Sequence, residues 1–237
     1  MEINPGHHWV VNIGNVAMNM DTLLIMWGVM AFLIAFSFLA TRNLSIKPNK
    51  TQALLEGIMS FFWSLTAPLG KDGKKHTPLL ASLFLFILTA NLAGQIPWRI
   101  YHLSAGELAS PTNDLNMTLA MALVVLIYYI GAGVIKKGPK YFLHYIKPTP
   151  LLAPLNILED IIRPFSLAVR LFANILAGEV LIMVMLGMGL GLMEKMFPMV
   201  FLPLIFMLFE IFVAVVQALV FTLLSSAYLS LAVEDNH

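Results

Sequence analysis

The sequence contains no cysteine and very few charged residues. Without cysteine the chain can form no disulfide and perform no thiolate chemistry. Only 11% of the 237 residues are charged, against about 25% in a soluble domain, while 59% are hydrophobic. The net charge is +1, which gives no indication of nucleic acid or of an acidic partner. This balance is typical of a membrane protein.

The hydrophobic residues form long runs. Residues 22–40, 79–98 and 116–135 contain no Asp, Glu, Lys or Arg. Each run is close to the ~20 residues that a helix needs to cross about 30 Å of hydrocarbon. Two longer apolar regions, 155–190 and 198–233, follow them. We therefore predict an all-α membrane protein with five membrane helices, as a single membrane domain over residues 1–237.

One shorter segment is too polar to cross the membrane comfortably, and we predict that it is an interfacial helix. The last two membrane helices are nearly twice as long as the bilayer requires, so we expect them to be strongly tilted and to form a hairpin. The predicted elements are a first span at 22–41, the interfacial helix at 50–68, a second span at 79–98, a third at 116–135, and the tilted hairpin at 155–190 and 198–233.

The positions of the basic residues orient the chain. Ten of them follow the first and third spans: Arg42, Lys47, Lys50, Lys71, Lys74, Lys75, Lys136, Lys137, Lys140 and Lys147. The opposite segments hold only Arg99 and Lys195. Positive residues stay on the cytoplasmic side, so we predict an outside N-terminus and a cytoplasmic C-terminus. The N-terminal segment lacks a basic region before an apolar stretch, which argues against a cleaved signal and suits a bacterial inner membrane protein.

Rare polar residues of the last two helices fall at matching depths. If the chain turns near Glu194 and Lys195, Arg170 lies level with Gln217, and Glu179 level with Glu210. The same register pairs Arg163 with Ser225. Glu179 lies ~13 Å along the helix from Arg170 toward the outer face. On the inner side of Arg170 lie Glu159, Asp160, Arg163 and Ser166. The sequence thus places polar groups open to either side, with an arginine between them.

Arg170 is the most informative residue. A guanidinium near the bilayer centre costs about 3 to more than 10 kcal/mol unless it is paired or hydrated, and it stays charged. Its nearest polar neighbour on the same helix face is Asn174, which cannot neutralise it. Glu179 lies on roughly the opposite face. We infer that the acidic partner belongs to another protein. The alternative is a buried ion pair that only holds helices together.

These residues also carry a resemblance to a known family. The stretch PFSLAVRLFANILAGE resembles the signature of subunit a of F-type ATP synthases, and the match continues in VVQALVFTLLSSAYLSLA, PTNDLNMTLAMAL and the N-terminal GHHW. The resemblance implies an ion-translocating stator subunit with two offset half-channels, active in hydrogen ion transport and ATP synthesis. Its implied partners are the c-ring of the rotor, the b subunits of the peripheral stalk and the lipid bilayer, with no direct nucleotide binding.

The resemblance also implies roles for single residues. Arg170 would act on the rotor carboxylates, with Asn174 and Gln217 beside it. Glu179 and Glu210 would line the outer half-channel, where they could share a proton. The implied outer entrance consists of Asn91, Asp114 and Asn116, and the inner half-channel of Glu159, Asp160, Arg163 and Ser166. Some relatives carry an Asp where Gly94 stands, so the resemblance does not determine which side chains line the outer entrance.

Three functional classes remain to be distinguished. The stator subunit is the first, a secondary transporter that binds an anionic substrate through Arg170 is the second, and a purely structural membrane subunit is the third. We predict no catalytic centre, metal or cofactor, because the histidines lie at ends or in loops and the chain has no HExxH, nucleophile elbow or Walker loop. The transported ion, H⁺ or Na⁺, is left open because the ion-binding carboxylate would belong to the rotor.

Overall fold

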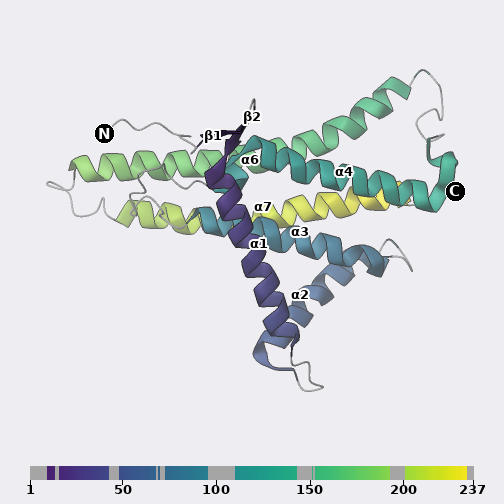
Figure 1. The fold of residues 1–237 in the computed structure, drawn as a ribbon, viewed down its shortest axis with the longest axis horizontal. Helices are drawn as coiled ribbons and strands as arrows, with labels where there is room; N and C mark the ends of the chain where they lie inside the picture. Colours follow the sequence, from purple (N-terminus) through teal and green to yellow (C-terminus); the bar gives the residue numbers. More distant parts are fainter. Residues whose placement is uncertain are drawn as a thin grey trace.

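The structure is a computed structural model that describes residues 10–13, 16–42, 48–67, 69, 73–95, 110–142, 151, 153–192 and 201–233. These residues are almost entirely helical (Figure 1). The elements in chain order are β1 (Val10–Ile13), β2 (Val16–Asn19), α1 (Met20–Thr41), α2 (Lys50–Thr66), α3 (Gly73–Gly94), the 3-10 turn η3 (Pro111–Asn113), α4 (Leu115–Lys137), the 3-10 turn η4 (Gly138–Phe142), α6 (Ala153–Leu192) and α7 (Phe201–Val233).

Five of the helices are long and apolar enough to cross a membrane: α1, α3, α4, α6 and α7. This confirms the predicted all-α membrane class and the number of membrane helices within the described part of the chain. The remaining helix, α2, has 17 residues, which is below the ~20 that span the hydrocarbon. Its place at the membrane interface stays a prediction, as does the tilt of the long hairpin.

The helix ends differ from the predicted ones mainly in α3. It begins at Gly73 and ends at Gly94, whereas the charge-free run predicted 79–98. The predicted span begins at Leu79, whereas the helix starts six residues earlier and includes Lys74, Lys75 and Pro78. Lysines can stand at a helix end near the membrane surface because their flexible side chains can reach water. The expected turn at Glu194–Lys195 lies outside the described residues.

A short antiparallel hairpin precedes α1 and was not predicted. β1 pairs with β2 from Val10 opposite Asn19 to Ile13 opposite Val16. Each strand has only four residues, too few for a clear alternating pattern in the sequence. The hairpin fixes the backbone of Asn19, the residue at which the chain enters α1.

The core lies between α3, α4, α6 and α7. α3 packs against α7, and α4, α6 and α7 pack against one another. Ile87, Leu171 and Phe221 are completely buried there. The dark purple helix α1 crosses this group steeply, while α6 and α7 extend past the ends of α3 and α4 (Figure 1). Only 11% of the most apolar stretch of α1 is buried, so most of its surface faces outward.

α2 is attached to the bundle at its C-terminal end. The ring of Phe62 is 1% exposed and lies 5.3 Å from the ring of Phe84 on α3. The hydroxyls of Thr66 and Thr77 are hydrogen-bonded at 2.9 Å, and Ser226 of α7 donates to the carbonyl of Leu65 at 3.3 Å. Both α3 and α7 therefore hold α2 in place.

We expect Phe62→Ala to lower the free energy of unfolding by about 3 kcal/mol, because it removes a buried ring and leaves a cavity between α2 and α3. The matched control is Phe61→Ala, since Phe61 is 42% exposed. Unfolding of both variants in mixed micelles by increasing SDS measures the difference. Equal losses for the two neighbours would contradict the observed packing.

Candidate functional site

Arg170 lies on the exposed face of α6. Ser166 and Asn174, one turn away on either side, are also exposed. Among the described residues, Arg170 forms no hydrogen bond or ion pair. A permanently charged group on an apolar helix is thus exposed, without a counter-charge among the described residues.

An amide pair links α6 to α7 beside the arginine. Asn174 donates from Nδ2 to Oε1 of Gln217 at 2.9 Å. Gln217 is buried, and its Nε2 has no hydrogen-bond partner among the described residues. The structure therefore brings Arg170, Asn174 and Gln217 to one region, with Gln217 oriented by Asn174.

The carboxyl group of Glu210 packs against the backbone of α6 at Gly178. A Cβ atom at Gly178 would overlap Oε1 of Glu210 and come within 2.8 Å of its Cδ. Glu210 is 5% exposed, and neither of its oxygens has a hydrogen-bond partner within the described residues. The side chain of Gln95 is the polar group near it. The absence of a side chain at Gly178 thus makes the space that Glu210 fills.

Glu179 points away from Glu210, toward the segment that precedes α4. Its Oε1 accepts from the backbone N–H of Ser110 at 3.2 Å, and its Oε2 accepts from Nδ2 of Asn113 at 2.6 Å. Glu179 and Glu210 therefore lie near the same level of the α6–α7 pair but in different surroundings.

The turn that holds Glu179 is fixed to α3. Thr112 donates to Oδ1 of Asn91 at 2.8 Å, and Asn91 donates to the carbonyl of Ala214 on α7 at 3.4 Å. Asn91 is fully buried, so it acts here as a connector between the turn and α7. A Cβ atom at Gly94 would lie 2.6 Å from Oγ of Ser110. An aspartate at position 94 would have no room in this arrangement.

Asp114 caps α4. Its Oδ1 accepts from the backbone N–H of Asn116 at 2.8 Å, and its Oδ2 accepts from Nδ2 of Asn19 at 2.7 Å. The side chain of Asn116 is exposed. Asp114 is thus the N-cap residue of α4, and it also joins the start of α1 to the start of α4.

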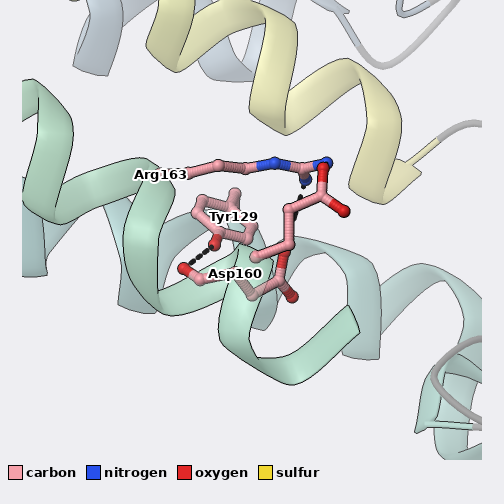
Figure 2. Close-up of polar contacts among 4 residues, drawn as sticks. Tyr129, Asp160 and Arg163 are labelled. Atoms are coloured by element: carbon pink, nitrogen blue, oxygen red, sulfur yellow. Dashed lines mark hydrogen bonds and ion pairs between the residues drawn. The ribbon is translucent and has the colours of Figure 1, made fainter. Parts of the chain in front are cut away.

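The acidic and basic residues predicted for the inner side form one cluster on α6 (Figure 2). Arg163 pairs with Glu159 and, at 3.3 Å, with Asp160. Its guanidinium lies 5.6 Å from the centre of the Tyr228 ring on α7. Arg163 is therefore neutralised within its own helix, in contrast to Arg170, while Ser166 lies on the exposed face and does not join the cluster.

Pro164 explains why Tyr129 takes part in this cluster. A proline has no N–H, so the carbonyl of Asp160 loses its usual helical donor. The hydroxyl of Tyr129 on α4 donates to that carbonyl at 3.2 Å (Figure 2). A side chain of α4 thus replaces the hydrogen bond that proline removes from α6.

The contacts between α6 and α7 agree with the register expected from the sequence to within one helical turn. Gly178, next to Glu179, touches Glu210 as expected. Arg163 contacts Tyr228 rather than Ser225, three residues further along α7. Within the described residues, no group of three or more His, Asp or Glu side chains could hold a metal ion.

Sequence analysis missed several residues of this site. They are Asn19, Ser110, Thr112, Asn113 and the fully buried Asp21. The available signal was the cluster of polar residues in SPTND directly before an apolar run. Asn19 and Asp21 carried a similar signal, because they stand at the entrance of the first span.

Most of the residues of this site lie within the range matched by the model of a known protein family. The sequence model of the family described as ATP synthase A chain matches residues 23–230. This range covers most of the chain and includes the arginines, acids and amides of α6 and α7. Asn19 and the hairpin β1–β2 precede it.

We expect Gly178→Ala to destabilise the protein, because the added methyl displaces the Glu210 carboxyl and overpacking costs about 1–3 kcal/mol. Gly131→Ala in α4 is the matched control, since nothing lies within 4 Å of its Cβ position. That control should gain up to about 1 kcal/mol from helix propensity. Unfolding in mixed micelles measures both, and the double variant Gly178→Ala/Glu210→Ala should recover part of the loss. Strictly additive losses would contradict the contact.

Proposed function

The chain belongs to the ATP synthase A chain family, and from that premise we propose how it moves ions. It is a multi-pass membrane protein and a stator subunit of an F-type ATP synthase. We propose that it provides two offset half-channels and that Arg170 acts on the carboxylates of the rotor c-ring between them. The single observation that carries this proposal is the exposed, uncompensated position of Arg170 on α6 among the described residues.

The electrostatics of Arg170 favour a partner outside the chain. Two unit charges 4 Å apart attract with about 4 kcal/mol at an effective dielectric constant of 20. That is comparable to the lower estimate of ~3 kcal/mol for placing an arginine at the centre of a membrane helix. A rotor carboxylate that stops beside Arg170 would therefore be held in its ionised form. The fixed charge of Arg170 would also repel any cation that approached along the direct route between the half-channels.

The outer half-channel of this proposal contains Glu179 and Glu210. Both are carboxylic acids of long apolar helices, and Glu210 packs beside the residue that precedes Glu179. Asn91, Asp114 and Asn116 belong to the same end of the protein. The hydrogen bonds of Asn91 and Asp114 support a role in shaping this entrance rather than in binding the ion themselves.

The inner half-channel of this proposal contains Glu159, Asp160, Arg163 and Ser166. Arg163 is already neutralised by its two acidic neighbours, so it can stand near a cation path without the strong repulsion that Arg170 exerts. Ser166 lies one turn from Arg170 on the same exposed face. An ion released at Arg170 would first meet the hydroxyl and then the carboxylates.

The mechanism requires no covalent chemistry. An ion enters from the outer side, neutralises a rotor carboxylate and frees it to turn into lipid. After nearly one rotation it is released on the inner side, because Arg170 draws the ionised carboxylate back. Each charge that crosses the potential contributes about 2.3 kcal/mol per 100 mV. The b subunits of the peripheral stalk would keep this subunit from turning with the rotor.

The alternative function is a secondary transporter in which Arg170 binds an anionic substrate. The exposed position of Arg170 and the family of the chain favour the stator function over it. A transporter would move its substrate as an isolated chain, whereas the stator needs the c-ring. Reconstitution of the chain with and without the rotor therefore distinguishes the two.

Arg170→Ala should abolish ATP-driven ion uptake by vesicles that contain the assembled complex, because the rotor carboxylates lose their counter-charge. ATP hydrolysis by the detached catalytic part should survive. The matched control is Arg42→Ala, which removes an exposed arginine at the end of α1 and should leave uptake unchanged. Persistent pumping in Arg170→Ala would mean that the arginine has only a structural role.

The proposed orientation, in the plasma membrane of a bacterium with the C-terminus in the cytoplasm, can be tested directly because the sequence has no cysteine. A membrane-impermeant maleimide should label Lys137→Cys at the end of α4 in inverted vesicles only. Asn116→Cys at the start of the same helix should react only in right-side-out vesicles. The opposite pattern would reverse the topology and exchange the two half-channels.

A further inference from the structure

Asn19 occupies a helix N-cap without capping its own helix. It is the N-cap residue of α1, yet its side chain makes no capping hydrogen bond there. Asparagine is among the preferred N-cap residues because its oxygen can accept from the first helical N–H groups. Here the amide instead donates to Asp114, 95 residues further along the chain. Asp21 in the first turn of α1 supplies a negative charge at the positive end of the helix.

Asp114 connects Asn19 to the turn whose residues donate hydrogen bonds to Glu179. While its carboxylate binds Asn19 and caps α4, its backbone N–H donates to the carbonyl of Pro111 at 3.3 Å. The N–H of Asn113 donates to the carbonyl of Ser110 at 3.0 Å. Asp114 therefore closes the same turn whose other members donate to Glu179. A shift of Asp114 would move the donors at Ser110 and Asn113.

We propose that Asn19 is a positioning residue for Glu179: by holding Asp114, it fixes the turn at residues 110–113, from which Ser110 and Asn113 donate hydrogen bonds to Glu179. The inference rests on the proposed function, in which Glu179 belongs to the outer half-channel. It adds the hairpin β1–β2 and the start of α1 to the parts of the chain that act on the ion path.

The geometry separates this role from simple packing. Asp114 is 9% exposed, Thr112 and Asn113 are 5% exposed or less, and Pro111 is buried, so the turn between the partly buried Asn19 and Glu179 is shielded. The turn is held on one side by Asn91 of α3, through Thr112, and on the other by Asn19. Asn91 fixes its distance from α3, while Asn19 fixes the end that leads into α4.

Asn19→Leu keeps the size of the side chain but removes the donor. In vesicles that contain the assembled complex, it should slow ATP-driven ion uptake by about tenfold, the effect expected when a hydrogen bond to a charged group is lost. Asn19→Asp should slow it at least as much, because two carboxylates would then face each other. Asn49→Asp is the matched control, since Asn49 is an exposed N-cap of α2 without a side-chain cap, and should leave uptake unchanged.

A reciprocal exchange tests positioning apart from folding. In Asn19→Asp/Asp114→Asn the hydrogen bond is restored with the donor on the other side, and the new asparagine can still cap α4 through its oxygen. Uptake should recover to within about threefold of the wild type, the difference between a charged and a neutral cap. Failure of the exchange to improve on Asn19→Asp, with equal amounts of assembled complex, would overturn the proposal.

A second cycle tests whether the effect passes through the turn. Asn113→Ala removes the hydrogen bond that Asn113 donates to Glu179, so adding Asn19→Leu should then slow uptake by a smaller factor than it does alone. If the double variant slows uptake by the product of the two single-variant factors, the substitutions act independently and the positioning role is overturned. Arg170→Ala in the same assay separates the outcomes. If it still pumps, the proposed function itself fails, and if it does not pump while Asn19→Leu pumps normally, only the inference about Asn19 fails.

Discussion

A polar group on a membrane-spanning helix must find a partner, because hydrocarbon offers it none. In this chain the requirement organises both ends of the bundle. At one end, Glu179 accepts hydrogen bonds from the 3-10 turn before α4. Asn91 binds that turn through Thr112, and Asn19 binds it through Asp114. At the other, Arg163 is neutralised by acids of its own helix and Tyr129 serves the carbonyl that Pro164 leaves free. Arg170 lies between them, exposed and without a counter-charge among the described residues, and we propose that its partner lies outside the chain.

The two arginines of α6 show what this constraint means for function. They are seven residues apart on one helix and have opposite surroundings, one with two carboxylates and an aromatic ring, the other on an open face. A neutralised arginine holds helices together, while an uncompensated one can act on a charge that moves past it. Their difference in surroundings, rather than their chemical identity, separates the structural role from the proposed functional one.

The sequence predicts best the features that follow from the length of apolar runs and from the spacing of polar residues along a helix. The five long helices follow from apolar runs, and the position of Glu210 beside Gly178, next to Glu179, follows from the level of polar residues on two antiparallel helices. The importance of Arg170, argued from the penalty for a charge in hydrocarbon, stays a prediction. Sequence reasoning could not place the turn around Glu179. That turn uses a backbone N–H, a threonine and neutral amides, which follow no helical period, and it joins residues from four separate elements. The directions in which Glu179 and Glu210 point also depend on Gly178. The sequence does not show this, because it does not show that the Glu210 carboxyl packs against Gly178.

The outer polar network has consequences for how the protein is made. Thr112 and Asn91 are 21 residues apart in the sequence, Asn19 and Asp114 are 95 apart, and Asn113 and Glu179 are 66 apart. During synthesis the first two contacts become possible at almost the same time, because Thr112 and Asp114 are only two residues apart, whereas the third must wait until most of α6 has been made. α1 can pack against α2 and α3 before that, but the contact of Asn19 must wait for the start of α4. Insertion of the chain and assembly of the ion path are thus separate events in biogenesis, and Glu179 is the last of these residues to reach its place.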